Sequence, residues 1–313
     1  MDARQLSYFL AVVDHGGFGR AAEHLHLAQP SLSQSIGGLE RELGVDLFHR
    51  VGRGVVLTDT GARLIEPARQ VVRDLEVVRD TARSANGLRR GRVDLVSMPS
   101  PGIEPLTTLM AAFAGEYPLV TVNAAGAFTP EEVVGQVRSG AAEIGLLGSA
   151  GHTRTADLRV LPLEDQPLVL VSPPGTDGPD PDRIARADLA GLRLVASQRG
   201  SLMRQLVDDV LAGGGDVHLA AEVDHRTSIL PLVLSGLGHA VLPSSWTTMA
   251  TRLGARVRLI EPVSHLRVAI VSRASRLTPA ARAFVGAAER YAQEHAQEHG
   301  QGDGHGDGQG HQA

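Results

Sequence analysis

Cysteine and lysine are both missing from this chain of 313 residues. Without cysteine the chain can form no disulfide and has no thiol redox switch, so peroxide sensing by a pair of cysteines is excluded. Without lysine, all 30 basic residues are arginine, a bias of composition from which no mechanism follows.

Long apolar segments and the common enzyme motifs are missing as well. The apolar segment from Leu6 to Val13 is too short to cross a membrane, and Asp14 and His15 close it without a basic leader. We therefore expect a cytoplasmic protein without membrane contact. Serine, histidine and aspartate occur, but not as Gly-x-Ser-x-Gly, His-Glu-x-x-His or a phosphate-binding glycine loop, so nothing favours an enzyme, a cofactor or a metal site.

What is present begins with two short amphipathic helices between residues 18 and 44. Their apolar faces, spaced by three and four residues, consist of Phe18, Ala21, Ala22 and Leu25 in the first helix and Leu32, Ile36, Leu39 and Leu43 in the second. Residues 26–28 form the turn between them. Pro30 begins the second helix, where its missing N–H costs no hydrogen bond.

The outward face of the second helix is small and polar. It holds Pro30, Gln34, Gly37 and Arg41, flanked by Ser31 and Ser33, and Gln29 precedes it at the helix start. Such a face suits the major groove of DNA, where glutamine can read adenine and serine can meet bases or phosphates. An ordinary surface helix pair is an equal alternative at this point, because polar outer faces are common.

Two short strands around a glycine-rich turn follow the helix pair. Residues 47–50 and 55–58 have strand character and flank Val51-Gly52-Arg53-Gly54. This pattern predicts a wing, in which Arg50 and Arg53 can hold phosphate or enter a narrow minor groove. The alternative is a solvated loop that happens to contain arginine.

A long helix is expected after the wing, begun by Thr58 and Asp59. Its apolar residues keep a period of 3.5 residues over three heptads: Leu64, Ala68, Val71, Leu75, Val78, Ala82 and Ala85. An apolar stripe behind a DNA-reading module favours the pairing of two copies, so we expect a homodimer or homotetramer. Packing of the stripe against the chain's own domain is the alternative.

Several motifs follow one another here at fixed spacing: the Ala-Ala pair of the first short helix, AQPSLSQSI, LERELGVDLFHR and LTDTG. Through these motifs, residues 1–60 resemble the winged helix-turn-helix of LysR-type transcriptional regulators. The remainder to about residue 295 resembles that family's effector-binding domain more loosely. The resemblance implies that Gln29, Pro30, Ser33 and Gln34 approach the bases and that the wing touches the DNA backbone. It also implies a tetramer and a target promoter near the chain's own gene.

The predicted reading helix departs from the resembled family at three positions. Gln34 stands where arginine is frequent, and Gly37 and Gly38 stand where bulkier helix formers are usual. Loss of the guanidinium removes a charge-assisted contact, and each glycine costs about 1 kcal/mol of helix propensity relative to alanine. The glycines either allow close approach to DNA or are a tolerated helix defect.

Charge and pattern both change beyond residue 92. The chain carries a net charge of +2 up to Arg92 and −7 after it, which directs nucleic acid to the N-terminal part. Beyond an expected hinge at residues 88–91, strands and helices alternate, which predicts an α/β domain. Strands are expected at 92–98, 119–123, 143–147, 192–196, 217–223, 238–242 and 266–272, and helices at about 105–116, 130–139, 201–211, 227–235 and from 279.

Two similar segments, SGAAEIGLLG from Ser139 and SGLGHAVLPS from Ser235, predict two similar lobes. The expected organisation is a winged helix-turn-helix at 1–60, a linker helix at 58–88 and a two-lobed, periplasmic-binding-protein-like effector domain at 91–295. Lobe I would comprise about 91–160 and 266–295, and lobe II about 161–265. Residues 296–313, rich in glycine, histidine, glutamine and aspartate, are expected to be a disordered tail without a site.

A ligand cleft is expected between the lobes, because open parallel sheets bind ligands beyond the carboxyl ends of their strands. The candidate contacts lie at strand ends or at the first turn of the next helix: Ser97, Ser100, Phe128, Thr129, Ser197, Arg199, Ser201, His225 and Thr227. Ser100 and Thr129 also match positions that line the effector cleft in the resembled family. Arg199 beside Ser197 and Ser201 favours a carboxylate effector, unless Arg199 is a surface charge.

These observations together predict a ligand-responsive transcriptional regulator that binds double-stranded DNA as a homo-oligomer. A solute-binding protein would share the two-lobed shape. That alternative leaves the first 90 residues without a role.

Overall fold

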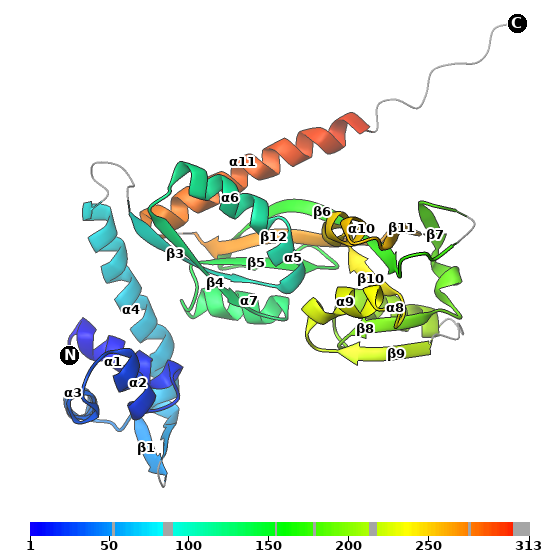
Figure 1. The fold of residues 1–313 in the computed structure, drawn as a ribbon. Coiled ribbons are helices and arrows are strands. Elements are labelled where there is room, and N and C mark those ends of the chain that lie inside the picture. Colours follow the sequence, from blue (N-terminus) through cyan, green and yellow to red (C-terminus); the bar gives the residue numbers. More distant parts are fainter. Residues whose placement is uncertain are drawn as a thin grey trace, which may run out of the picture.

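The computed structural model describes residues 1–51, 54–83, 90–153, 155–177, 180–212, 218–274 and 277–302 (Figure 1). A small N-terminal domain is followed by one long helix and by a two-lobed α/β domain. The predicted N-terminal domain, linker helix and two-lobed domain are therefore all present, in the predicted order.

The N-terminal domain begins with three helices, α1 (Ala3–Asp14), α2 (Phe18–His24) and α3 (Gln29–Leu43). A capping box starts α1, in which the backbone N–H of Gln5 donates to Asp2 Oδ1 at 2.8 Å and the backbone N–H of Asp2 donates to Gln5 Oε1 at 3.0 Å. Gly44 ends α3 in the left-handed conformation, with φ of 70°. The bounds of α2 and α3 confirm the predicted helix pair.

The wing is an antiparallel hairpin of β1 (Phe48–Val51) and β2 (Gly54–Leu57). Both strands are shifted by one residue from the predicted ranges 47–50 and 55–58. Leu47 lies before β1, because its side chain is fully buried in the domain core and its N–H donates to Glu40 Oε1 at 2.8 Å. The backbone of Arg50 pairs with Val55 inside the ladder. Arg53 lies outside the described residues.

The linker helix α4 (Asp59–Arg83) starts as predicted, since Thr58 Oγ1 accepts a hydrogen bond from the Gly61 N–H at 2.9 Å. Its first half packs on α1, where Leu64, Ile65, Ala68 and Val72 join the core of the N-terminal domain. Further along the predicted stripe, Val71, Leu75 and Val78 are exposed. The stripe therefore serves the chain's own domain at one end and is uncovered at the other, while Ala85, Leu88 and Arg89 lie outside the described residues.

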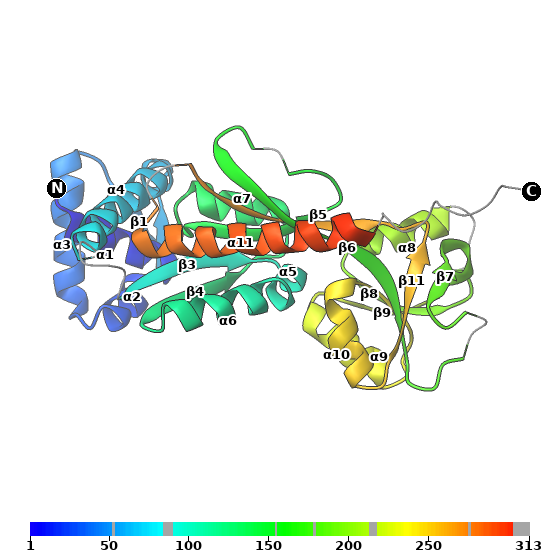
Figure 2. The same cartoon turned by 90° about the horizontal axis from the view of Figure 1, so that it is seen from above.

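Lobe I is a sheet covered on both faces. Its strands are β3 (Gly91–Ser97), β4 (Val120–Gly126), β5 (Ile144–Ser149), part of β6 (Leu158–Ser172) and β12 (His265–Arg273), in the spatial order β4-β3-β5-β12-β6. Helices α6 (Leu106–Glu116) and α11 (Pro279–Gly302) cover one face and α7 (Pro130–Arg138) covers the other (Figures 1 and 2). Phe113 and Phe284 join α6 to α11 edge to face, with ring centroids 5.2 Å apart.

Lobe II contains β7 (Arg183–Ala185), β8 (Arg193–Ser197), β9 (His218–Val223), β10 (Ala240–Pro243) and β11 (Arg256–Glu261), with helices α8 (Leu202–Ala212), α9 (Ile229–Leu234) and α10 (Thr247–Arg252). It continues the same sheet through β10, β11 and β7, while β8 and β9 pair as a separate two-stranded parallel sheet. Short 3₁₀ turns lie at Arg186–Leu189, Arg226–Ser228 and Ser244–Trp246. The short helix α5 (Pro99–Ile103) lies where the lobes meet, and Ile103 packs against the core of lobe II.

The two lobes share strand β6. It pairs with β12 as far as Pro167, and from Leu168 it pairs with β10 and β11. The expected boundary near residue 160 therefore falls inside this strand, and the passage between the lobes lies at residues 167–168. The strands β6, β7 and β11 were not among the sequence predictions, whereas the other strands of the two lobes and α6, α7, α8, α9 and α11 lie within a few residues of theirs.

The expectation of a disordered tail from residue 296 is wrong at its start, because α11 continues to Gly302. Alanine, glutamine and glutamate in this stretch are good helix formers, and one turn earlier His295 stacks on Tyr291 with ring centroids 3.8 Å apart. Residues 303–313 lie outside the described residues. Among the helices in the described ranges, none is both long and apolar enough to span a membrane.

Candidate nucleic-acid interface and interlobe cavity

The outward face of α3 is polar and uncovered. Gln29, Pro30, Ser31, Gln34 and Arg41 are exposed and Ser33 is half-buried, while Leu32, Ile36 and Leu39 below them are at most 1% exposed. The apolar stripe anchors the helix on α1 and α2 and leaves the polar stripe for a partner. All five residues predicted on this helix therefore lie on one accessible surface.

The two glycines of α3 face different surroundings. A Cβ placed on Gly37 would meet nothing within 4 Å, whereas one on Gly38 would lie 3.4 Å from Gln5 Nε2 of α1. The Arg41 guanidinium folds back along the helix, where its Nε donates to the Gly37 carbonyl at 3.1 Å. Gly37 thus leaves a shallow gap on the outward face, and Gly38 turns toward the domain itself.

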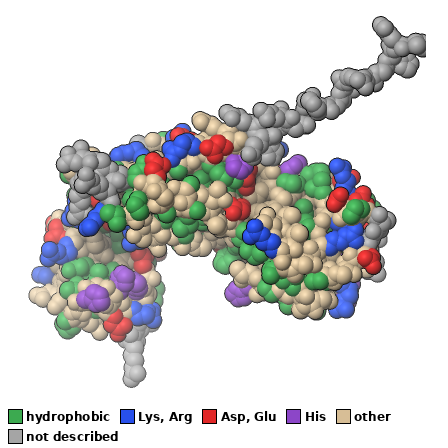
Figure 3. Space-filling model, turned by 45° about the horizontal axis from the view of Figure 1, so that its top comes forward, with side chains coloured by type: hydrophobic (Ala, Val, Ile, Leu, Met, Phe, Trp, Pro, Cys, Tyr) green, Lys and Arg blue, Asp and Glu red, His purple; other side chains and the backbone are tan. Residues whose placement is uncertain are grey.

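The visible surface of the N-terminal domain has mixed charge. Figure 3 shows basic, acidic, histidine and apolar side chains interspersed on it, with no continuous basic patch on this side. This agrees with the small net charge of +2 up to Arg92. This side of the domain therefore presents no strong positive field.

The linker helix meets lobe I at a cluster of charged residues. Arg273 Nη1 of β12 donates to Gln70 Oε1 of α4, and Arg73 lies against Gly140, where a Cβ would come within 3.0 Å of its Nε. Glu143, 4% exposed, accepts hydrogen bonds from the Thr278 N–H at 2.8 Å and from Thr278 Oγ1 at 3.1 Å. Burial raises the pKa of Glu143 and lowers that of Arg73, and each charge opposes the shift of the other.

A cavity of about 210 Å³ lies between the lobes. Lobe I contributes the start of α7 and the end of β5, and lobe II contributes the loop after β8 and the start of α8. The lining includes Phe128, Thr129, Arg199 and Ser201 from the predicted set, together with Met98, Glu131, Ser149, Gln198, Leu202, Met203, Gln205, Arg226 and Leu266. The cavity therefore opens where strand ends and helix starts of both lobes converge.

Most polar predicted residues near the cavity are already hydrogen-bonded to the fold. Thr129 Oγ1 accepts from the Glu132 N–H at 3.2 Å and caps α7. Ser197 and Ser201 join their hydroxyls at 2.6 Å, and Ser97 Oγ donates to the Met98 carbonyl at 2.9 Å. Ser100 Oγ differs, because it is buried without a hydrogen-bond partner in the described part of the chain.

The sequence prediction missed the residue between two of its candidates. His225 and Thr227 are exposed and do not line the cavity, whereas Arg226 lines it and is only 5% exposed. Arginine is seldom buried, so the sequence offers no reason to prefer it over its polar neighbours. Its burial depends on the 3₁₀ turn that starts at Arg226 and leads into α9.

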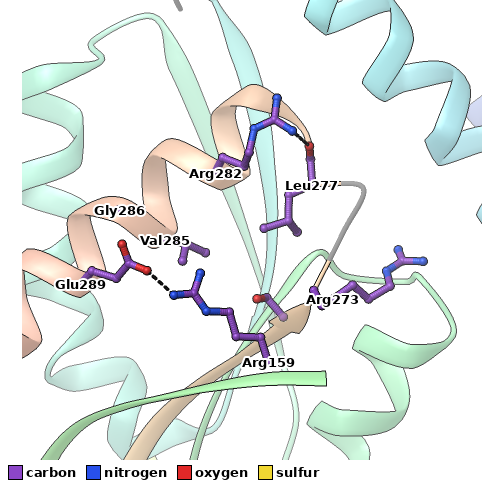
Figure 4. Close-up of a pocket in the computed structure, with 9 residues that line it drawn as sticks. Arg159, Arg273, Leu277, Arg282, Val285, Gly286 and Glu289 are labelled. Carbon is purple, nitrogen blue, oxygen red and sulfur yellow. Dashed lines mark hydrogen bonds and ion pairs between the residues drawn. The ribbon is translucent and has the colours of Figure 1, made fainter. Parts of the chain in front are cut away.

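A second cavity, of about 310 Å³, lies in lobe I between β6, β12 and α11 (Figure 4). Its arginines have partners in the fold. Arg159 Nη2 donates to Glu289 Oε1 at 2.5 Å, and Arg282 Nη1 donates to the Leu277 carbonyl at 2.8 Å. The charges that face this cavity are therefore held by neighbouring residues.

Two family models match the chain. Residues 3–62 match the bacterial regulatory helix-turn-helix protein model of the LysR family, and residues 86–293 match the LysR substrate binding domain. The second match alone covers more than half of the chain. The chain belongs to the LysR family of transcriptional regulators.

Relatives of this LysR-type regulator cover most of its length. The HTH-type transcriptional regulator IlvR of Caulobacter vibrioides is 33% identical over 269 residues, which are 84% of this chain and 89% of the relative. The SDS degradation transcriptional activation protein of a Pseudomonas species is 31% identical over 293 residues, 91% of this chain and 94% of the relative.

Solved structures agree on the fold. CbnR, a LysR family transcriptional regulator complexed with its target DNA, is 25% identical with a TM-score of 0.67 and matches 93% of this chain and all of its own. Full-length OxyR from Pseudomonas aeruginosa is 24% identical with a TM-score of 0.71 and matches 94% of this chain and 95% of its own. This LysR-type regulator therefore has a DNA-binding domain and a two-lobed effector-binding domain, and as a family member it binds DNA and responds to a small molecule.

Proposed function

We propose that this LysR-type regulator reads duplex DNA with the outward face of α3. Gln29, Pro30, Ser31, Ser33 and Gln34 would meet base edges and nearby phosphates, and Arg50 and Arg53 of the wing would hold the backbone. The observation that carries this assignment is the division of α3 into a fully buried stripe and an uncovered polar stripe. Because the protein acts on DNA, its place of action would be the cytoplasm.

The regulator would act as a homodimer or homotetramer. Val71, Leu75 and Val78 follow one another at steps of four and three along α4 and are exposed by 44, 36 and 65%. A seam with this spacing is completed when a second α4 packs against it. Two such chains would present two α3 helices to paired half-sites on one face of the duplex.

The effector would bind in the interlobe cavity. The predicted set, Ser97, Ser100, Phe128, Thr129, Ser197, Arg199, Ser201, His225 and Thr227, divides into four residues that line the cavity and five that do not. The hydroxyls of Thr129 and Ser201, with the exposed guanidinium of Arg199, support the proposal of a carboxylate. Residues 1–60, 58–88 and 91–295 would thus read DNA, join two copies and sense the effector.

Footprinting on the DNA upstream of its gene, across a series of salt concentrations, tests the DNA-reading assignment. A protected site is expected, with an affinity that falls steeply as salt rises. Gln34→Ala should change base preference, and Arg50→Ala should weaken all sequences alike. An affinity that is indifferent to salt, or the reverse pattern in the two variants, would contradict these roles.

A further inference from the structure

The interlobe cavity contains a buried guanidinium that forms no hydrogen bond or ion pair with the residues that the structure describes. Arg226 lines the cavity, is 5% exposed, and its Nε makes no hydrogen bond to any described residue. Within the described ranges no carboxylate forms an ion pair with it. Burial lowers its pKa, and no neighbouring acid opposes that shift.

Other arginines of lobe II show how this fold satisfies a buried charge. Arg204 is 2% exposed, and its Nε donates to Asp208 Oδ1 at 2.8 Å while its Nη1 pairs with Glu222. Arg199, which lines the same cavity as Arg226, is exposed and remains hydrated. Arg258 is also buried, 6% exposed, and its Nε bonds to no described residue, but the charges of Asp180 and Asp188 oppose the lowering of its pKa by burial. Among these four arginines, Arg226 alone is removed from water with no described carboxylate to oppose the shift of its pKa.

The surroundings of Arg226 favour an anion further. Leu202 and Met203 are the first two residues of α8 and line the cavity, and the N–H groups of a first helical turn have no acceptor within the helix. The acidic lining residue Glu131 is exposed at the start of α7 in the opposite lobe and forms no ion pair with Arg226. One end of the cavity is therefore electropositive.

The rest of the lining limits the size and polarity of an occupant. Met98, Phe128 and Leu266 contribute apolar surface. A cavity of about 150 Å³ accommodates benzene, so a cavity of 210 Å³ has room for roughly eight to nine non-hydrogen atoms. The occupant that fits is compact, with an apolar body and one negative end.

We propose that Arg226 is the charge anchor of the effector site and that the effector is a compact monocarboxylate whose anionic end pairs with it. This inference rests on the proposed effector role of the interlobe cavity. Without a bound anion the guanidinium would be buried without compensation, which disfavours the folded state. A bound carboxylate removes this penalty and links the two lobes across the cavity.

The first experiment needs no ligand and measures the urea midpoint of the full chain. Arg226→Met keeps the side-chain bulk and removes the unpaired charge, so the midpoint should rise. Arg204→Met, the matched control, removes a charge that has two partners, so its midpoint should fall. A fall for Arg226→Met like that for Arg204→Met would show that Arg226 has a structural counterion and would overturn the inference.

The second experiment measures thermal shifts of the full chain with carboxylates of roughly four to nine non-hydrogen atoms, including butyrate and benzoate, each beside its neutral amide. At least one carboxylate should stabilise the wild type and its amide should not. Arg226→Met should weaken that carboxylate by about thirtyfold or more, as expected for loss of a buried charge partner. Arg252→Gln, which changes an exposed arginine of α10 outside the cavity lining, should retain it.

The outcomes separate this inference from the proposed function. Hydrogen exchange at the amides of residues 128, 129 and 201–203 reports whether a compound occupies the cavity. Three results would overturn the role of Arg226 as anion anchor and leave the DNA-reading assignment standing. A neutral amide could protect these residues from exchange, a carboxylate could bind the wild type and Arg226→Met equally well, or none of the carboxylates could raise the melting temperature. Failure of the wild type to bind duplex DNA would overturn the proposed function instead.

Discussion

The substitution Gly37→Ala tests whether this glycine allows close approach to DNA or is a tolerated defect of the helix. A Cβ at this position meets nothing within 4 Å, so Gly37→Ala introduces no clash within the domain. Alanine favours a helix over glycine by about 1 kcal/mol, which corresponds to roughly fivefold slower exchange of the amide hydrogens of α3. The helix should therefore become more stable.

The same methyl group should weaken binding to DNA. Gly37 lies on the outward face of α3 beside Gln34. In the proposed mode of DNA reading, the backbone at Gly37 would approach a base edge closely and leave no room for a side chain. Overpacking of a tight contact costs about 1–3 kcal/mol, so the affinity should fall by roughly fivefold or more. Fluorescence anisotropy with a duplex selected by the wild type from a random pool measures this loss.

Gly38→Ala is the matched control. Its Cβ would lie 3.4 Å from Gln5 Nε2, an ordinary contact within the domain, so this variant should gain the same protection from exchange and keep its affinity for DNA. If Gly37→Ala also stabilised α3 and bound DNA as tightly as the wild type, the outward face would not be the reading surface at that position. Faster exchange in Gly37→Ala would refute the propensity argument.

Three further predictions concern Gly61 at the start of α4, Val78 in the exposed stripe of α4 and the buried carboxyl group of Glu143. Gly61→Ala places a methyl group against the Leu47 carbonyl and should lower the free energy of unfolding by about 1–3 kcal/mol. Urea denaturation measures this loss, and an unchanged midpoint would contradict the close contact between Gly61 and Leu47. Val78→Arg puts a charge into the exposed seam of α4 and should shift sedimentation toward monomer, whereas an unaltered sedimentation coefficient would place the oligomer contact elsewhere. Burial raises the pKa of Glu143 above 4.5, so the folded state holds its proton more tightly than the unfolded state. Stability should therefore fall as pH rises from about 4.5 through the raised pKa, and less so in Glu143→Gln, as urea midpoints across this range would show.

The helix pair and the wing could be predicted because their signals are local. Apolar residues at helical spacing, Pro30 at a helix start and the glycines of the turn each act within a few residues. The alternation of strands and helices in the two lobes is local in the same way. These elements therefore lie within a few residues of their predicted bounds.

Strand β6 and Arg226 show what the sequence could not reveal. The middle of β6 reads PLEDQP, in which Pro162 and Pro167 and two acidic residues speak against a strand. The strand forms because β12, about 100 residues later, pairs along it, with an irregularity between Val268 and Ala269 opposite this stretch. Burial of Arg226 likewise depends on packing between distant segments, so periodicity alone selects its exposed neighbours instead.

The contact between α4 and lobe I determines which part of the molecule can move. The hydrogen bond between Gln70 and Arg273 joins the linker helix to lobe I, which also holds α11. Lobe II lies at the opposite end of the molecule (Figure 1). We therefore expect the DNA-binding domain, α4 and lobe I to move together, and lobe II to rotate about the passage at residues 167–168 of β6. Closure of the cavity within a single chain would then leave α3 in place relative to lobe I, and an effector signal would reach the DNA through a contact of lobe II with a neighbouring subunit.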